Sequence, residues 1–195
     1  DEIAKDASRQ EILRRYYAAL CDKRKGLISE ETVLKLKILM KKAGITVNDR
    51  AVMAPALQKA ALTGLPAAAI QLRDGRIVTG KTSELLGASS ALLLNALKAL
   101  AGIDDDIHLI SPVIIEPIQH LKTDHLGNRN PCLHTDETLI ALSICAATDE
   151  KAELAMQQLD KLIGCEVHSS VILSAVDEKV FKRLGVNLTC EPSYK

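Results

Sequence analysis

Aromatic residues and a surplus of one charge are the main absences from this sequence of 195 residues. It has no Trp, one Phe and three Tyr, too few to build the aromatic platforms that stack single-stranded bases. Its 25 basic and 25 acidic side chains cancel, so no global field attracts a phosphate backbone or an anionic membrane. These absences predict an aliphatic core and argue against nucleic-acid and membrane partners.

Long apolar runs and paired cysteines are also absent. No stretch approaches the roughly 20 apolar residues of a membrane span. The five cysteines are widely spaced, with no CxxC pair and no preceding signal peptide, which is typical of a reducing compartment. We therefore expect a soluble, cytoplasmic protein with mostly buried thiols. The opening residue, Asp1, runs directly into a predicted helix, as in a chain cut from a longer protein.

The first third of the chain carries helical signals. Ser8 with Glu11 forms a capping-box pattern that predicts the start of a first helix. Gly44 ends a second predicted helix, and the two together indicate a helical hairpin. A third helix ends near Gly64, and Pro55 either kinks it or lies in its first turn.

The pattern changes to α/β after residue 64. A short apolar run over 67–72 and a returning strand over 76–78 flank the turn signal Asp74-Gly75 and predict a β-hairpin. Beyond them we predict a buried helix over 85–101, strands over 107–110, 139–147, 167–173 and 186–189, and helices over 150–162 and 177–184. The predicted fold class is α/β, a helical hairpin followed by a mixed sheet with packed helices. The predicted division is a helical segment over 1–64 and an α/β domain over 65–195.

The segment 75–82 matches the phosphate-loop pattern G-x-x-x-x-G-K-[ST]. The β-branched Ile77 and Val78 argue against such a loop, because they fit the returning strand of the hairpin better. A narrower interpretation is an anion-binding turn at the N-terminus of the next helix, and the alternative is an ordinary helix cap. The residues of this turn are Gly80, Lys81, Thr82 and Ser83.

The segment 122–136 is an unusually polar predicted loop. Arg129, between Asn128 and Asn130, offers a planar charged fork for a carboxylate or phosphate. The alternative interpretation is a solvated loop whose Asn and Asp residues cap its own backbone.

Histidines add acid–base chemistry to the same loop. Asp124 is placed to orient His125 or His134 as the acid–base group. Zinc is a weaker hypothesis, because no familiar ligand spacing is present. Its conceivable ligands are His120, His125, Cys132 and His134. We therefore predict catalytic histidines and no metal.

Three blocks, in order ASRQEILRRYY, GRIVTGKTSELLGASSALLLNALK and IQHLKTDHLGNRNPCLHTDETLIAL, resemble the C-terminal part of a bacterial conserved-hypothetical family, catalogued as domain of unknown function eighteen forty-six. The resemblance extends from about Ala7 to Tyr194. It implies a bacterial cytoplasmic protein, an upstream α/β domain with its own phosphate-loop-like segment, and no settled activity. Its motifs TGKTSEL and DHLGNRNPxLH contain Lys81, Ser83, Glu84, Asp124, His125, Asn128, Arg129, Asn130, Pro131 and His134.

A second resemblance concerns the fold alone. The hairpin and buried helix resemble the opening of the cytidine-deaminase-like fold. Zinc deaminases of that fold need H/C-x-E at one helix start and P-C-x-x-C on the next helix. Here Glu84 lacks its ligand neighbour, and Pro131-Cys132 is followed by Leu-His134. The resemblance therefore implies a scaffold without zinc-dependent deamination.

Two functions follow from the sequence as hypotheses. In the first, the chain is part of an enzyme that binds a phosphorylated or carboxylated small molecule, nucleotide-like molecules among them. Lys81 and Arg129 would hold the anion, and the upstream domain would complete the site. In the second, the chain is a homo-oligomerisation module that assembles through the hairpin 8–44 and the helix 85–101. Neither hypothesis specifies a cofactor.

Overall fold

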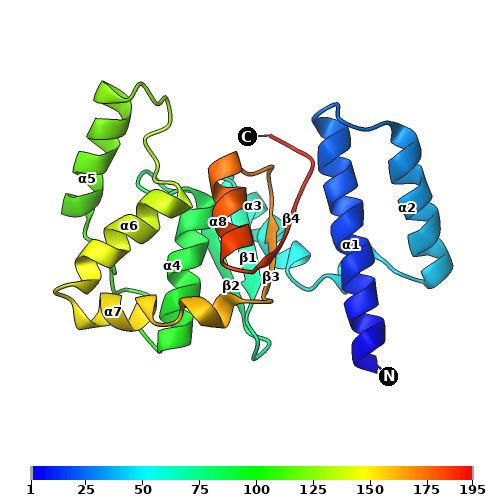
Figure 1. Cartoon of the computed structure of the whole chain (residues 1–195), viewed down its shortest axis with the longest axis horizontal. Coiled ribbons are helices and arrows are strands. Elements are labelled where there is room, and N and C mark those ends of the chain that lie inside the picture. Colours follow the sequence, from blue (N-terminus) through cyan, green and yellow to red (C-terminus); the bar gives the residue numbers. More distant parts are fainter. Residues whose placement is uncertain (1, 195) are drawn as a thin grey trace.

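A four-stranded mixed sheet organises the described residues, 2–194, of this computed structural model (Figure 1). Its strands are β1 (Ala67–Gln71), β2 (Ile77–Lys81), β3 (Glu166–Ser169) and β4 (Asn187–Cys190), in the order β2-β1-β3-β4. β1 is antiparallel to both β2 and β3, whereas β3 and β4 are parallel. The predicted α/β class with a mixed sheet is confirmed. Asp1, the residue on which the expectation of a longer protein rests, lies outside the described residues.

The Asp74-Gly75 turn joins β1 to β2, as predicted. Gly75 has a φ of 85°, in the left-handed region where glycine carries no Cβ penalty. Its amide donates to the Leu72 carbonyl at 2.9 Å. Because Ile77 to Lys81 form β2, the phosphate-loop pattern folds as an edge strand rather than as a loop.

The N-terminal helices form a hairpin beside the sheet (Figure 1). They are α1 (Glu2–Arg24) and α2 (Glu30–Ala43), and Gly44 ends α2 with a φ of 65°. The predicted cap at Ser8 is wrong. Its hydroxyl donates to the Ala4 carbonyl inside α1, because the good helix formers before it extend the helix. α1 packs on β4, and α2 packs on α1 around a small cluster of Leu13, Met40 and Ile45.

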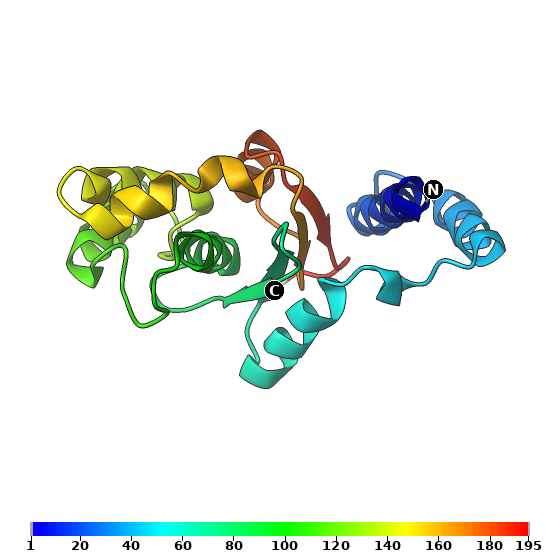
Figure 2. The ribbon, with the colours of Figure 1, turned by 90° about the horizontal axis from the view of Figure 1, so that it is seen from below.

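Helices cover both faces of the sheet (Figure 2). After the 3₁₀ turn η1 (Val47–Asp49), helix α3 (Met53–Thr63) packs on one face, with Pro55 in its first turn. Helix α4 (Ala88–Ala101) packs on the opposite face against β1 and β2. Successive β1 residues point to opposite faces of the sheet: Ala69 clusters with residues at the start of α3, and Ile70 joins the main core beneath α4.

The remaining helices extend the α4 side of the molecule. They are α5 (Pro112–His120), the π-helical turn η2 (Leu121–His125), α6 (Thr135–Ala146), α7 (Glu150–Met156), the 3₁₀ turn η3 (Leu159–Leu162) and α8 (Ala175–Arg183). Leu142 of α6, Ala152 of α7 and Phe181 of α8 enter the main core. Four of the five cysteines are buried, as expected, and Cys132 is partly exposed. None of the described helices has the length and apolarity to cross a membrane.

Two predicted strands are wrong. The apolar run 139–147 lies mostly in α6, where Ile140 and Ile144 face outward while Ala141 and Leu142 are buried. That spacing is helical, but a run of nine residues in which only Ser143 is polar does not reveal its period. The segment 107–110 is irregular, although Leu109 and Ile110 are buried.

The helix predicted from residue 85 begins three residues later. Leu86 forms an isolated bridge with Leu133, and the Ser83 hydroxyl accepts hydrogen bonds from the Leu85 and Leu86 amides. These contacts hold the backbone before Gly87 in an extended turn, so α4 starts at Ala88.

Candidate functional site

A cavity of about 490 Å³ lies where the N-termini of α4, α6 and α8 meet. We call it the His134 cavity. It is lined by Pro66, Thr82, Gly87–Ser89, Arg129–His134, Val171–Ser174 and Asp177. β2 and β3 are both antiparallel to β1, so their carboxyl ends share the edge of the sheet where this cavity lies. Its volume is in the range of small-molecule sites.

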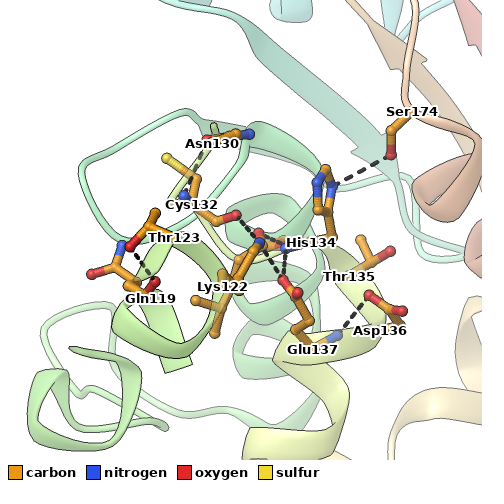
Figure 3. A network of polar contacts seen from close by, with 12 residues as sticks. Gln119, Lys122, Thr123, Asn130, Cys132, His134, Thr135, Asp136, Glu137 and Ser174 are labelled. Carbon is orange, nitrogen blue, oxygen red and sulfur yellow. Dashed lines mark hydrogen bonds and ion pairs between the residues drawn. The ribbon is translucent and has the colours of Figure 1, made fainter. Parts of the chain in front are cut away.

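His134 is held by a carboxylate from another helix. It is the N-cap residue of α6, and its Nδ1 lies 3.1 Å from Oδ2 of Asp177 in α8. Ser174, the N-cap residue of α8, also donates to Asp177 Oδ2, at 2.9 Å. The Ser174 hydroxyl lies 3.4 Å from His134 Nδ1 (Figure 3). Among residues 2–194, no hydrogen bond reaches His134 Nε2.

The donors around Asp177 define the charge of this pair. The amide and hydroxyl of Thr135 each lie 2.9 Å from Asp177 Oδ1. Because Ser174 and Thr135 donate, Asp177 is an ionised acceptor and His134 Nδ1 carries the proton. Burial alone would raise the pKa of Asp177, but the hydrogen bonds from His134, the Thr135 amide and Ser174 outweigh it and lower that pKa. The Asp177 hydrogen bond raises the pKa of His134 against the effect of burial.

The start of α4 is buried and uncapped. Gly87 is its N-cap residue and offers no side chain, and the amides of Ala88, Ser89 and Ser90 make no hydrogen bond within residues 2–194. Ser89 is only 3% exposed, it lines the cavity, and its hydroxyl makes no hydrogen bond to any other described residue. A buried helix start without partners offers amide donors and the positive end of the helix dipole to an anion.

A buried lysine fixes the loop that carries Arg129. The Lys122 side chain is 3% exposed, and its Nζ donates to the Cys132 carbonyl at 2.7 Å and to Glu137 Oε2 at 2.6 Å (Figure 3). Glu137 Oε2 also accepts from the His134 amide at 2.9 Å. Lys122 therefore ties η2 to the segment that leads into α6. Arg129 and Asn130 lie on the exposed rim of the cavity.

The structure divides the ligand residues predicted from sequence. Thr82, Arg129 and Asn130 meet at the His134 cavity, whereas Lys81, Ser83 and Asn128 are exposed and do not line it. Gly80 pairs with Ala68 in the sheet, and a Cβ at Gly80 would collide with the backbone of Leu92 in α4.

The catalytic residues predicted from sequence are also divided. His134 lines the cavity, but Asp124 is exposed and bonded to His120 at 3.1 Å rather than to His125 or His134. His125 is exposed at the end of η2. Across the described residues, no three His, Cys, Asp or Glu side chains gather to hold a metal ion.

Sequence reasoning missed Asp177, Ser174 and Ser89. The pattern Ser174-x-x-Asp177 is a visible helix-start signal, and the Ser174 hydroxyl indeed accepts from the Asp177 amide. Nothing local indicates that Asp177 lies against His134, 43 residues earlier.

Two family models cover almost the whole chain. The model described as domain of unknown function DUF1846, C-terminal, matches residues 48–195. The chain belongs to the DUF1846 family. The model described as domain of unknown function DUF1846, N-terminal, matches residues 1–44. The N-terminal model ends just after α2 and the C-terminal model begins within η1, so α3, which packs on the sheet, lies in the C-terminal part. The division at residues 64 and 65 stays a prediction.

Curated relatives in the DUF1846 family are longer proteins. The UPF0371 protein CE2832 of Corynebacterium efficiens is 57% identical over 195 residues, and the UPF0371 protein cu0538 of Corynebacterium urealyticum is 55% identical over 194. The UPF0371 protein SpyM50764 of Streptococcus pyogenes is 51% identical over 195 residues. Each comparison covers 100% of this chain but only 39%, 39% and 40% of the relative. The chain thus spans about two fifths of the length of these relatives.

Proposed function

We propose that the His134 cavity binds a phosphorylated or carboxylated small molecule as part of an enzyme. The observation that carries this proposal is the buried, uncapped start of α4, where three amides and the Ser89 hydroxyl have no partner within residues 2–194. An anion there would accept these hydrogen bonds and interact favourably with the helix dipole.

Arg129 supplies the side-chain charge in this proposal. It lines the cavity whereas Lys81 does not, so we assign the anion to Arg129 and the α4 amides rather than to a Lys81–Arg129 pair. The Arg129 guanidinium forms bidentate hydrogen bonds with carboxylates and phosphates. Asn130 Oδ1 accepts a hydrogen bond from the Cys132 amide, which leaves the NH₂ group of Asn130 for the ligand.

His134 transfers a proton in this proposal. Asp177 fixes the tautomer that carries a proton on Nδ1, so Nε2 is the atom that gives or takes a proton. The raised pKa of His134 keeps more of the imidazolium form near neutral pH, which suits both anion binding and general-acid catalysis. Ser174 contacts the same Nδ1 side of the ring, so it positions the pair and is not a nucleophile.

Thermal unfolding of this chain with a ligand panel tests the proposal. The panel contains inorganic phosphate, nucleotides, sugar phosphates, dicarboxylates and Zn²⁺. A ligand at about 100 times its Kd adds roughly 2.7 kcal/mol of stability, which appears as a higher Tm. Arg129→Ala should abolish this rise, and the matched control Arg9→Ala, an exposed change on α1, should retain it. A panel without any rise contradicts the proposal.

A second candidate function is homo-oligomeric assembly, and one observation favours it. Leu34, Ile38 and Leu39 of α2 are 53%, 47% and 45% exposed, which leaves an apolar face on a helix whose main neighbour is α1. The other predicted contact is unsuited, because nine residues of α4 are buried within the fold. Under this hypothesis the chain forms dimers through α2.

Sedimentation velocity separates the two candidates. Assembly through α2 predicts a dimer at micromolar concentration that Leu34→Lys dissociates. The matched control Leu62→Lys changes a residue on α3 that is 85% exposed and should leave the dimer intact. A parent chain that sediments as a monomer contradicts assembly and leaves the ligand-binding proposal standing.

A further inference from the structure

The His134 cavity has an extended apolar wall next to its polar residues. This wall consists of Pro66, Pro131, Val171, Ile172 and Leu173, whereas the side chain of Leu133 belongs to the main core. We infer that the ligand carries an apolar body attached to its anionic group, such as a phosphate monoester or carboxylate with an aliphatic chain rather than a polyol phosphate. This inference rests on the proposed anion site and specifies its ligand class.

The size of the cavity supports a body beyond the anion. Its volume is about 490 Å³, whereas a water molecule occupies about 30 Å³ of liquid and a phosphate ion displaces only a few waters. A phosphate at the start of α4 would therefore leave most of the cavity to the rest of the ligand.

The apolar wall is joined directly to the anion end. Leu133 is fully buried, and its carbonyl accepts hydrogen bonds from the Gly87 amide at 3.2 Å and from the Ser90 hydroxyl at 2.8 Å. These bonds attach Leu133 to the first residues of α4. Pro131, two residues before Leu133, therefore lines the same cavity as Ala88 and Ser89, which places part of the apolar wall near an anion bound to the α4 amides.

The other part of the wall is held by the sheet. The Ser170 amide donates to the Ala67 carbonyl at 2.9 Å, and the Ile172 amide donates to the Ser193 carbonyl at 2.8 Å. The Ser169 hydroxyl accepts from the Val171 amide at 3.3 Å. The Val171 and Ile172 amides of the wall are thus already paired and do not offer donors to the ligand. Hydroxyl groups of a polyol placed against the wall would lose their hydrogen bonds to water without replacement.

A homologous series of ligands tests this inference by isothermal titration calorimetry. The probes are inorganic phosphate and methyl, propyl and butyl phosphate, with acetate, butanoate and pentanoate as the carboxylate arm. Burying a methylene stabilises a complex by about 0.8 kcal/mol, so Kd should fall about 4-fold per methylene. Glycerol phosphate, which matches propyl phosphate in chain length but adds two hydroxyls, should bind more weakly than propyl phosphate.

Two matched variants place the apolar body. Val171→Ser, a change in the wall, should flatten the dependence of Kd on chain length while phosphate still binds. Val176→Ser, an equal change on the exposed side of α8 that does not line the cavity, should leave the dependence unchanged. Ile172→Ser gives a second wall variant if Val171→Ser does not fold.

The outcomes separate the inference from the proposed function. Equal Kd values across the series, or tighter binding of glycerol phosphate than of propyl phosphate, would overturn the apolar body while the anion site stands. A chain-length dependence unchanged in Val171→Ser and Ile172→Ser also overturns it, because the body then lies elsewhere. No binding of any probe in either arm contradicts both the inference and the anion site.

Discussion

Two helices of equal length, α2 and α4, are stabilised in different ways. Each has 14 residues, but α2 has two buried residues whereas α4 has nine. α2 has acidic residues in its first turn, basic residues in its last turn and an i,i+4 pair of Glu31 with Lys35, which are local signals. α4 has no acidic residue in its first turn, and neither helix has a side-chain cap hydrogen bond at its start. Its stability therefore comes from packing, and its uncapped start is where we propose that the anion binds.

The largest effect on the free energy of unfolding is expected at Arg50, where the helical hairpin joins the sheet. Arg50 is 1% exposed, and its guanidinium pairs with Glu166 and donates to Thr189 and to the Val167 carbonyl. Arg50→Met breaks this buried ion pair and should cost about 3 to 5 kcal/mol in the free energy of unfolding, measured in urea. The exposed Arg15→Met should cost less than about 1 kcal/mol. Equal losses would mean that Arg50 does not join the two regions.

The second largest effect on the free energy of unfolding is expected when leucine is replaced by alanine in α4 rather than in α2. Leu97→Ala removes a fully buried side chain from α4 and should cost about 2 to 5 kcal/mol. Leu34→Ala changes a residue of α2 that is 53% exposed and should stay within about 0.5 kcal/mol. Urea midpoints of the two variants make this comparison. Similar shifts would show that α2 is covered in solution, as assembly through α2 requires.

The His134–Asp177 pair should make stability depend on pH. The pKa of His134 is raised in the folded chain, so the stabilisation is complete below the unfolded pKa near 6.5 and is lost as pH rises through the folded pKa. Asp177→Asn should lower the pKa of His134 in NMR titrations and remove this dependence. Asp124→Asn, which changes the exposed pair with His120, should do neither. A drop in the His134 pKa in Asp124→Asn would contradict the assignment of Asp177.

The smallest effect is expected at an ion pair on the hairpin surface. Lys23 pairs with Glu30 across the α1–α2 turn, and their side chains are 43% and 60% exposed. Lys23→Gln should reduce the free energy of unfolding by less than about 1 kcal/mol, because solvent screens exposed charges. The measurement is urea unfolding at low and high salt. A loss close to that of Arg50→Met would contradict the distinction between the two pairs.

Local signals account for the parts of the fold that sequence predicted. The turn at Asp74-Gly75 and the helix end at Gly44 depend on neighbouring residues, and both are confirmed. The apolar run before Ala147 gave no period, so α6 was predicted as a strand. For such runs, tertiary packing decides between helix and strand.

The candidate site could be predicted only in part for the same reason. Arg129, Asn130 and His134 follow one another in a single polar loop, so their types and spacing were visible together. Asp177 and Ser89 reach the cavity from α8 and α4, and only the packing of those helices brings them there. Asp124 is close to His134 in sequence, yet η2 turns it toward His120.

Gly80 affects the His134 cavity although it does not line it. The glycine lets β2 touch the backbone of α4 at Leu92, four residues, or about 6 Å of helix rise, after Ala88. Any larger residue there would force β2 and α4 apart, and a shift of α4 would carry its first amides with it. Such a shift would change the dimensions of the proposed anion site from the side of α4 that faces the sheet. Gly80, first considered as a ligand residue, would in that case tune binding without ever touching the ligand.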